Sequence, residues 1–341
     1  MQILSQLKCV KQFIYYSQSN INSMSLYLDN KDSFLSPKVS QYGNHSIMTN
    51  IYKPTKKKFV NIDTRFQEEY NTSRLASVTC KIPQQIIDVK SIQICSMELP
   101  ICFYNFSNQR KNTFFVVKTS GNSYLVTIDD GQYDDATDLV KEINSKLAYA
   151  TLIDSTTVFA LNSVLSFGLN KNKIIQITNM GSASVTILWG VSESGHFDKY
   201  QLKMKLGWCL GFREPEYFIL PLNAASDEDI IVAESILDLH TFRYLYLVID
   251  EFNQTNPNSF ITPSSSSFLS ANTLARISLD STSFGKVLSL NTRFGNIVSD
   301  IRVYSGKTDI QKLQLHIADE WGNLIDLNQA EFSFCLELQC E

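Results

Sequence analysis

The stretch IIDVKSIQICSMELPICF, residues 86–103, carries the clearest structural signal in the chain. Ile92 and Ile94 alternate with polar residues, as in a strand with one buried face. The alternation then moves by one residue, to Cys95, Met97 and Leu99. A strand that changes phase in this way either contains a β-bulge or is buried on both faces. The stretch therefore predicts a long strand of a β protein.

Short β signals separated by turn residues continue on both sides of this stretch. The expected strands span 59–65, 77–82, 113–119, 124–129, 174–178, 185–189 and 244–250, with alternating apolar positions again in 313–317 and 332–338. Gly121 and Asn122 predict a hairpin turn between two of these strands, and 179–182 predicts a second hairpin. The last strands, around the turn 319–323, are expected to form a three-stranded antiparallel run.

One amphipathic helix is expected at 138–148. Its apolar side chains share one face, and Thr137 is placed to cap its first turn. The face consists of Leu139, Val140, Ile143 and Leu147. Many short strands with one inserted amphipathic helix are typical of a mainly β protein, an antiparallel β-sandwich of the jelly-roll kind.

Charge is distributed unevenly along the 341 residues, whose formal net charge is -4. Residues 1–58 hold eight lysines against two aspartates and carry +6, so that the remainder carries -10. We expect 1–58 to be a basic, extended N-terminal arm, because it lacks a sustained apolar period. Residues 59–250 are expected to form a β-sandwich region. A Ser/Asn/Pro-rich linker or long loop follows at 251–272, and strands at 273–341 complete the sandwich or form a second small β subdomain.

The arm ends in a lysine cluster, Lys53, Lys56, Lys57 and Lys58, which is the candidate partner-binding site. Three interpretations remain open: a solvated charge run, contact with an acidic protein surface or an anionic lipid headgroup, and nucleic-acid binding. The acidic body acts against nucleic acid, and no groove of aromatic and basic residues for single strands is evident.

The sequence predicts no enzyme, no cofactor and no metal site. The four histidines are far apart, and phosphate-binding glycine loops, nucleophile elbows and dinucleotide motifs do not occur. The acidic cluster Asp129, Asp130, Asp134, Asp135 and Asp138 could supply oxygen ligands to calcium. It also lies just before the expected helix, where the helix dipole favours negative charge, and this structural role is the preferred interpretation.

The seven cysteines are scattered without a Cys-x-x-Cys pair, which indicates reduced structural thiols rather than zinc ligands. The N-terminal residues contain no uninterrupted apolar segment typical of a signal peptide, and no apolar run approaches the roughly 18 residues of a membrane-spanning helix. We therefore expect a reducing, aqueous compartment. The string LGWCLGFR, 206–213, with two glycines among large apolar groups, predicts a corner of the core.

Several strings, taken in order, resemble a group of virion structural proteins, the minor capsid or vertex proteins of nucleocytoplasmic large DNA viruses. The strings are FVNIDTRFQ, VKSIQICSMELP, FYNFS, NTFFVV, DLVKEINSKL, LGWCLGFR, YLYLVIDEFN and RVYSGKTDIQKLQLHIADEWGNLIDLNQAEFSFCLEL. The resemblance covers 59–341. It implies a non-enzymatic β-sandwich component of a virus particle, without catalytic residues to transfer.

The resemblance also implies a location in the virion, assembly in the host cytoplasm, and partners among the major capsid protein and other minor capsid proteins. The basic arm adds an inner viral membrane as a further partner. Two alternatives remain: a penton or vertex protein of the same shell, and a carbohydrate-binding β-sandwich, which would place Trp189, Trp208 or Trp321 beside polar groups at the surface.

Overall fold

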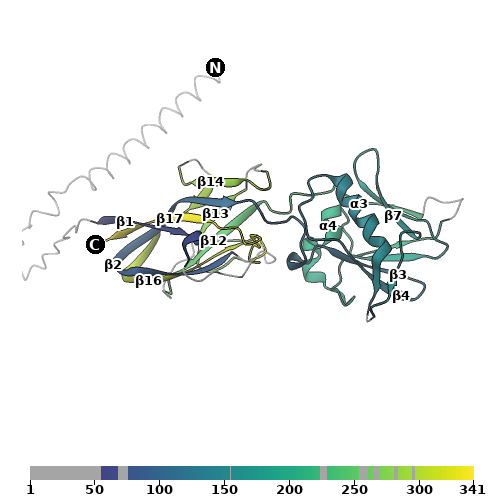
Figure 1. Ribbon diagram of the computed structural model, residues 1–341, viewed down its shortest axis with the longest axis horizontal. Helices are drawn as coiled ribbons and strands as arrows, with labels where there is room; N and C mark the ends of the chain where they lie inside the picture. The colour runs from purple at the N-terminus through teal and green to yellow at the C-terminus, as the bar shows by residue number, and fades with distance from the viewer. Residues whose placement is uncertain are drawn as a thin grey trace, which may run out of the picture. The chain divides into compact units, whose positions relative to one another are not determined.

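The computed structural model describes residues 55–67, 76–153, 155–222, 229–252, 260–263, 269–279, 283–293 and 296–341. Within these ranges the protein is mainly β, and its strands form three antiparallel sheets (Figure 1). Lys53 and the rest of the arm before residue 55 lie outside the described residues. None of the described helices has the length and apolar character needed to span a bilayer.

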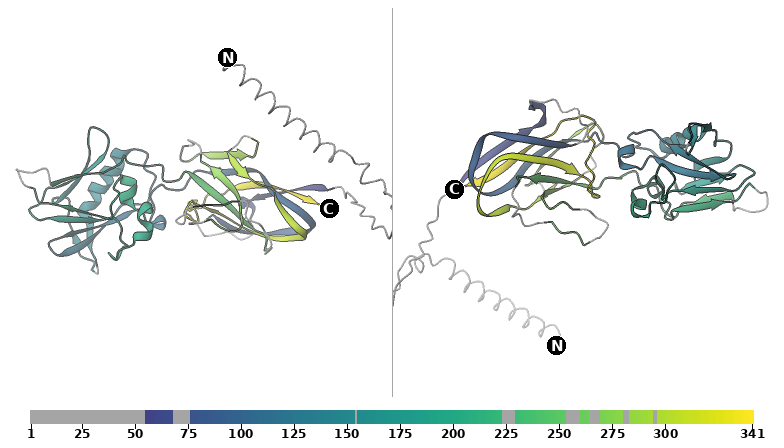
Figure 2. Two further views of the ribbon diagram at one scale, coloured as in Figure 1. Left: turned by 180° about the vertical axis from the view of Figure 1, so that it is seen from behind. Right: turned by 90° about the horizontal axis from the view of Figure 1, so that it is seen from below.

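The largest sheet has eight strands in the order β1-β17-β2-β16-β12-β13-β15, with β14 paired to β2 outside this path. Its strands are β1 (Lys56–Asp63), β2 (Ser77–Pro100), β12 (Tyr244–Asp250), β13 (Thr273–Ser278), β14 (Val287–Asn291), β15 (Ile297–Ser299), β16 (Arg302–Ala318) and β17 (Ser333–Cys340). The first and last of these strands pair along their whole length, with Lys56 opposite Cys340 and Asp63 opposite Ser333. Figure 2 shows this pair as the purple and yellow strands lying side by side.

The change of phase near Cys95 is a β-bulge. On β17, Cys335 pairs with Ser96 and the next residue, Leu336, pairs with Ile94, which leaves Cys95 as the extra residue. Because of this extra residue, Ile94 and Met97 both face the core although they are three residues apart. Burial on both faces is not needed to explain the pattern, since Cys95 is only half-buried.

Residues from both ends of the described chain build the core of the eight-stranded sheet. Side chains of β2 pack with those of β12, β13, β16 and β17. The fully buried members include Ile92, Met97, Leu247, Leu315 and Phe334. The C-terminal strands thus complete the sheet that β1 and β2 begin.

Residues between β2 and β12 form two smaller sheets with a core of their own. The six-stranded sheet, in the order β10-β9-β3-β4-β5-β6, contains β3 (Phe114–Thr119), β4 (Asn122–Thr127), β5 (Ala150–Leu152), β6 (Val158–Phe159), β9 (Val185–Leu188) and β10 (Glu216–Ile219). The three-stranded sheet, in the order β11-β8-β7, contains β7 (Leu165–Leu169), β8 (Ile175–Asn179) and β11 (Ile230–Val232). Buried residues from Phe106 to Ala233 fill this second core. The buried side chains of the range 59–250 therefore belong to two separate clusters.

Helix α3 (Ala136–Lys146) confirms the expected amphipathic helix, with Leu139, Val140 and Ile143 buried. Its N-cap is Asp135 rather than Thr137, because the Asp135 carboxylate accepts a hydrogen bond from the Thr137 backbone N–H at 2.8 Å. The described short helices are η1 (Thr64–Phe66), η2 (Asn108–Arg110), η3 (Leu147–Tyr149), η4 (Lys199–Met204) and α4 (Leu206–Leu210).

The string 206–213 forms a buried corner, as its glycines suggested. Gly207 lies against the ring of Trp189 so closely that a Cβ atom there would overlap the indole. Gly211 ends α4 in the left-handed region, at φ 101°, which glycine adopts without steric cost. Trp189 itself stacks on Phe212, with 5.3 Å between the ring centroids. The side chain that covers Gly207 is therefore Trp189, which lies outside this string.

Two expected strand pairings are wrong. Residues 179–182 do not close a hairpin, because β8 pairs with β7 and β11 whereas β9 pairs with β3 and β10. Strands β16 and β17 do not form an antiparallel run, because β2 lies between them. The hairpin at Gly121 and Asn122 is confirmed, with Phe114 opposite Thr127.

The structure bears on two of the expected segment boundaries. Strand β1 begins at Lys56, so the last three residues assigned to the arm belong to the eight-stranded sheet. An edge strand has a side exposed to water, which tolerates lysine. The lysines interrupt the apolar alternation, so the start of this strand is not recognisable from the sequence pattern.

Of the expected linker 251–272, the ranges 253–259 and 264–268 lie outside the described residues.

Candidate partner-binding surface

Strand β1 presents three lysines of the cluster, Lys56, Lys57 and Lys58, at the edge of the eight-stranded sheet. Within the described residues β1 pairs with β17 alone, and its other edge carries no neighbouring strand. Lys56, Lys57, Lys58 and Phe59 are all exposed, whereas Ile62 is buried in the core. The strand is therefore anchored at its C-terminal end and presents its basic N-terminal half to solvent.

The turn after β1 fixes its C-terminal end. Asp63 caps η1 by accepting a hydrogen bond from the Arg65 backbone N–H, and the guanidinium of Arg65 lies 2.6 Å from the same carboxylate. The side-chain hydrogen bond from Arg65 lowers the pKa of Asp63 below its ordinary value. Thr64 then exchanges hydrogen bonds with the backbone of Phe332, which joins this turn to the segment before β17.

The three described lysines of the cluster differ in their partners. Side chains of successive strand residues point to opposite faces, so Lys57 shares a face with Phe59, and Lys56 shares the other with Lys58. Lys57 Nζ lies 2.7 Å from Glu337 Oε1 on β17. For Lys56 and Lys58, no ion pair with an acidic side chain is found among the described residues. These two lysines are the ones available to an external anion.

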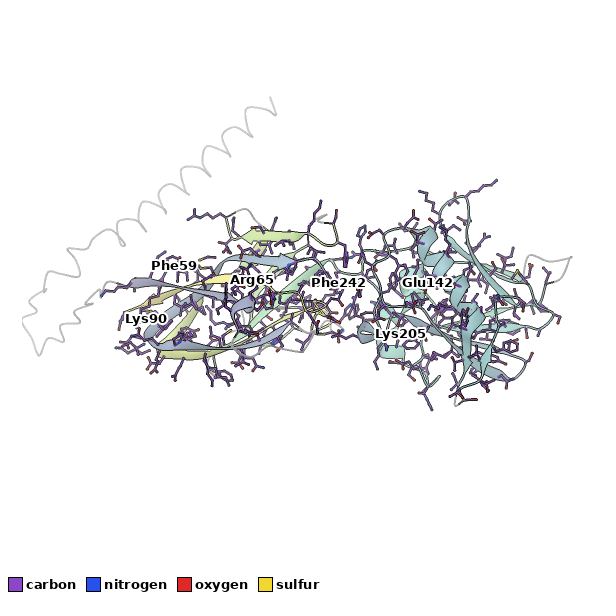
Figure 3. The ribbon with its side chains drawn as sticks, in the orientation of Figure 1. Phe59, Arg65, Lys90, Glu142, Lys205 and Phe242 are labelled. Carbon is purple, nitrogen blue, oxygen red and sulfur yellow. The ribbon has the colours of Figure 1, made fainter. Side chains whose placement is uncertain are left out.

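The fold brings two further lysines to this end of the sheet. Lys90 Nζ lies 3.3 Å from Glu341 Oε1, and Lys307 Nζ lies 3.0 Å from Asp88 Oδ1. The pairings of Cys340 with Val89 and of Val89 with Thr308 place β17, β2 and β16 side by side here. Figure 3 shows Phe59 and Lys90 toward the same end of the sheet. The sequence offered no signal for these residues, because only the strand order brings them near β1.

Exposed apolar side chains mark the edge strands of all three sheets. Phe59 of β1 is 63% exposed and Phe218 of β10 is 61% exposed. The other exposed apolar residues on edge strands are Val158 and Phe159 of β6, Ile230 and Val232 of β11, Val287 of β14 and Val298 of β15. Edge strands of isolated proteins usually carry charges or prolines that prevent pairing, so these apolar edges are unusual for a protein without partners.

The acidic cluster before α3 makes internal contacts. Lys146 Nζ lies 2.6 Å from Asp129 Oδ1, and Lys141 Nζ lies 3.1 Å from Asp138 Oδ1. Asp135 caps the helix, and hydrogen bonding to Thr137 lowers its pKa. No group of three metal-ligating side chains is found in the part of the chain that the structure describes. The geometry fits the helix-capping role of these acids.

The tryptophans that a carbohydrate-binding protein would display differ in exposure. Trp189 is buried in the second core. Trp208 and Trp321 are half-buried and line one cavity of about 210 Å³ with polar residues that include Arg213 and Asp238. The guanidinium of Arg213 lies over the indole of Trp208, 4.3 Å from the ring centroid. One face of Trp208 is therefore already covered by its own chain.

The described cysteines are free thiols with weakened acidity. Burial raises the pKa of Cys102 to about 11 and that of Cys209 to about 12. Burial raises the pKa of Cys95 as well, and the nearby carboxylate of Glu337 adds to the effect. Such thiols are poor nucleophiles and poor metal ligands, because both roles need the thiolate.

No protein-family model matches the chain, and no curated protein matches it. Among solved structures, the mavirus penton protein is similar over 83% of this chain and 99% of its own, with 14% sequence identity and a TM-score of 0.41. A chain in the cryo-EM structure of the Sputnik virophage is similar over 84% of this chain and 98% of its own, with 12% identity and a TM-score of 0.37.

Proposed function

We propose that the protein is a non-enzymatic structural component of a large DNA virus particle, a minor capsid protein that contacts other capsid proteins. The observation that carries this proposal is the set of exposed apolar side chains on edge strands of all three sheets. A shell component must contact several neighbours at once, and protein interfaces are built from apolar and aromatic anchors with polar rims.

The resemblance of the ordered strings in 59–341 to virion structural proteins supports the same function, and it supplies the particle context that geometry alone lacks. We further propose that the eight-stranded sheet forms a jelly-roll-like sandwich and that the N-terminal arm, which reaches as far as β1, contacts a neighbouring capsid protein or the inner viral membrane.

Fractionation of purified, washed particles by layer, with mass spectrometry of each fraction, tests the proposal. The protein is expected in the shell fraction at a fixed number of copies per particle. Detection in infected-cell lysate alone, with none in washed particles, would refute the proposal. The copy number also distinguishes a minor capsid protein from the alternative, a vertex protein. An icosahedral shell has twelve five-fold vertices, and the number of copies of a vertex protein is set by these vertices.

Removal of the arm is a second test. The deletion must end at residue 54, because removing 1–58 would also delete the first three residues of β1. The shortened protein is expected to keep the circular dichroism spectrum and thermal transition of the body and to enter particles less efficiently. High salt should weaken incorporation of the full chain in the same way, because exposed charges are screened within about 10 Å at 0.1 M ionic strength. Equal incorporation of both proteins at every salt concentration would show that the arm has no assembly role.

A second candidate function, glycan binding, is favoured by one observation, the joint lining of one cavity by Trp208 and Trp321 with polar residues. A glycan array with the full chain tests it. Binding that is lost on Trp321→Ala would support this function, and an array without hits would remove it.

A further inference from the structure

We propose that strand β1 accepts an acidic, extended segment of a partner chain as an added antiparallel strand. The inference rests on the proposed function and deepens it, because it names a mode of contact and the chemistry of the partner. Strand addition of this kind uses main-chain hydrogen bonds for affinity and alternate side chains for specificity.

The length of β1 is the first argument. Strand β1 has eight residues, whereas the other described edge strands have two (β6), three (β11 and β15), four (β10) or five (β7 and β14). No described backbone hydrogen bond joins β1 to a neighbour other than β17, apart from the turn at its end. A free edge of this length can pair with a strand of the usual five or six residues.

The lysines supply the second argument, which concerns charge. Lys56 and Lys58 lie on one face of β1 and form no ion pair within the described residues, and Lys57 on the other face already pairs with Glu337. An added strand with acidic residues opposite Lys56 and Lys58 would form two cross-strand ion pairs. The same lysines would repel a second copy of β1 added in parallel, so they disfavour that form of self-pairing and favour an acidic partner.

The remaining residues of β1 define the rest of the sequence pattern expected in the partner segment. Val60 packs at the border of the core on the same face as Lys58, and Phe59 is 63% exposed on the opposite face. Apolar residues opposite Val60 and Ile62, and an aromatic residue opposite Phe59, would extend the core and cover the ring. Read in the antiparallel direction, the favoured partner has the pattern apolar, polar, apolar, aromatic, acidic, polar, acidic.

The test uses the full chain and a capped synthetic heptapeptide, Val-Thr-Val-Tyr-Glu-Thr-Glu, labelled for fluorescence polarisation. Three control peptides accompany it: one with both Glu replaced by Gln, one with the sequence reversed, and one N-methylated at alternate residues so that one edge cannot form main-chain hydrogen bonds. Hydrogen-exchange mass spectrometry of the complex reports the protection of amides in 56–63.

The expected result is saturable binding of the first peptide, with slower amide exchange in 56–63 and weaker binding of each control. The double variant Lys56→Gln/Lys58→Gln should weaken binding about two- to thirtyfold at low salt, since two cross-strand charge pairs are lost. The matched variant Lys118→Gln/Lys171→Gln, which removes two exposed lysines elsewhere, should bind as the unmodified protein does.

Equal affinity for the N-methylated peptide would overturn strand addition, and equal affinity for the Gln peptide would overturn the acidic partner. Absence of binding at millimolar peptide, or self-association of the protein through 56–63 that excludes the peptide, would also overturn the proposal. None of these outcomes bears on whether the protein is found in washed particles, so the proposed function is tested separately.

Discussion

Glu251 and Arg302 form a buried ion pair beside the strands of the eight-stranded sheet, with 2.7 Å between Glu251 Oε2 and Arg302 Nη1. The Glu251 side chain is fully buried and that of Arg302 is 5% exposed. Arg302 also donates hydrogen bonds to the backbone oxygens of Ile249 and Asn272, and Tyr304 Oη donates to Glu251 Oε1 at 2.7 Å. Burial together with the adjacent Glu251 carboxylate raises the pKa of Tyr304. The cluster joins the end of β12 to the starts of β13 and β16.

We expect Glu251→Gln to lower the free energy of unfolding by about 3–5 kcal/mol, because it leaves the Arg302 charge buried without its counter-ion. Urea denaturation followed by circular dichroism measures the loss. Tyr304→Phe removes one hydrogen bond and should cost only about 1–3 kcal/mol. If Glu251→Gln fails to fold, the double variant Glu251→Leu/Arg302→Met should still fold, since it removes both charges. A Glu251→Gln protein as stable as the unmodified chain would contradict the role given to the pair.

The contact between Gly207 and Trp189 predicts a second stability effect. Gly207→Ala places a methyl group inside the volume of the indole, and relief of such overpacking typically costs about 1–3 kcal/mol. Gly306→Ala is the matched control, because a Cβ at Gly306 meets no atom within 4 Å. Thermal unfolding should therefore separate the two variants, and a Gly207→Ala transition at the temperature of the control would show that the corner relaxes freely.

The half-buried His316 predicts a dependence of stability on pH. Burial lowers the pKa of His316 below its ordinary value of about 6.5, and the carboxylate of Asp250 partly opposes the effect. As pH falls below 6.5, the unfolded chain binds the proton before the folded chain does, so stability falls until the folded protein is protonated as well. The loss of stability between pH 7.5 and pH 5 should be smaller in His316→Asn than in the unmodified protein. The exposed His196→Asn variant is the control, and an equal loss in all three proteins would contradict the prediction.

The thiol of Cys209 is expected to resist alkylation in the folded protein. With a pKa of about 12, on the order of one molecule in ten thousand holds the reactive thiolate at pH 8, and burial blocks access as well. Mass spectrometry after iodoacetamide treatment should find Cys209 unmodified in the native protein and modified in urea. Equal rates of labelling in both conditions would show that the corner around α4 opens readily.

The local pattern of the chain is enough to determine the β class, the hairpin at Gly121 and Asn122 and the helix that became α3, and it restricts the change of phase near Cys95 to a bulge or burial on both faces. Each of these features depends on residues close together in the sequence, whose periodicity and turn preferences act before any distant contact forms. The N-cap was expected at Thr137 and is Asp135, two residues earlier, because both residues offer side-chain oxygens to the first turn and only the backbone path decides between them.

Tertiary structure alone decided which strands are neighbours. The alternation of apolar residues in β16 and β17 fits any antiparallel partner, and only the packing of the whole core inserted β2 between them. The same packing brings Lys90 and Lys307 to the end of the sheet where β1 presents its lysines, and it gives 106–233 a core separate from that of the eight-stranded sheet. Sequence periodicity specifies which face of a strand is buried, whereas the choice of neighbour depends on contacts between residues hundreds of positions apart, which no local pattern encodes.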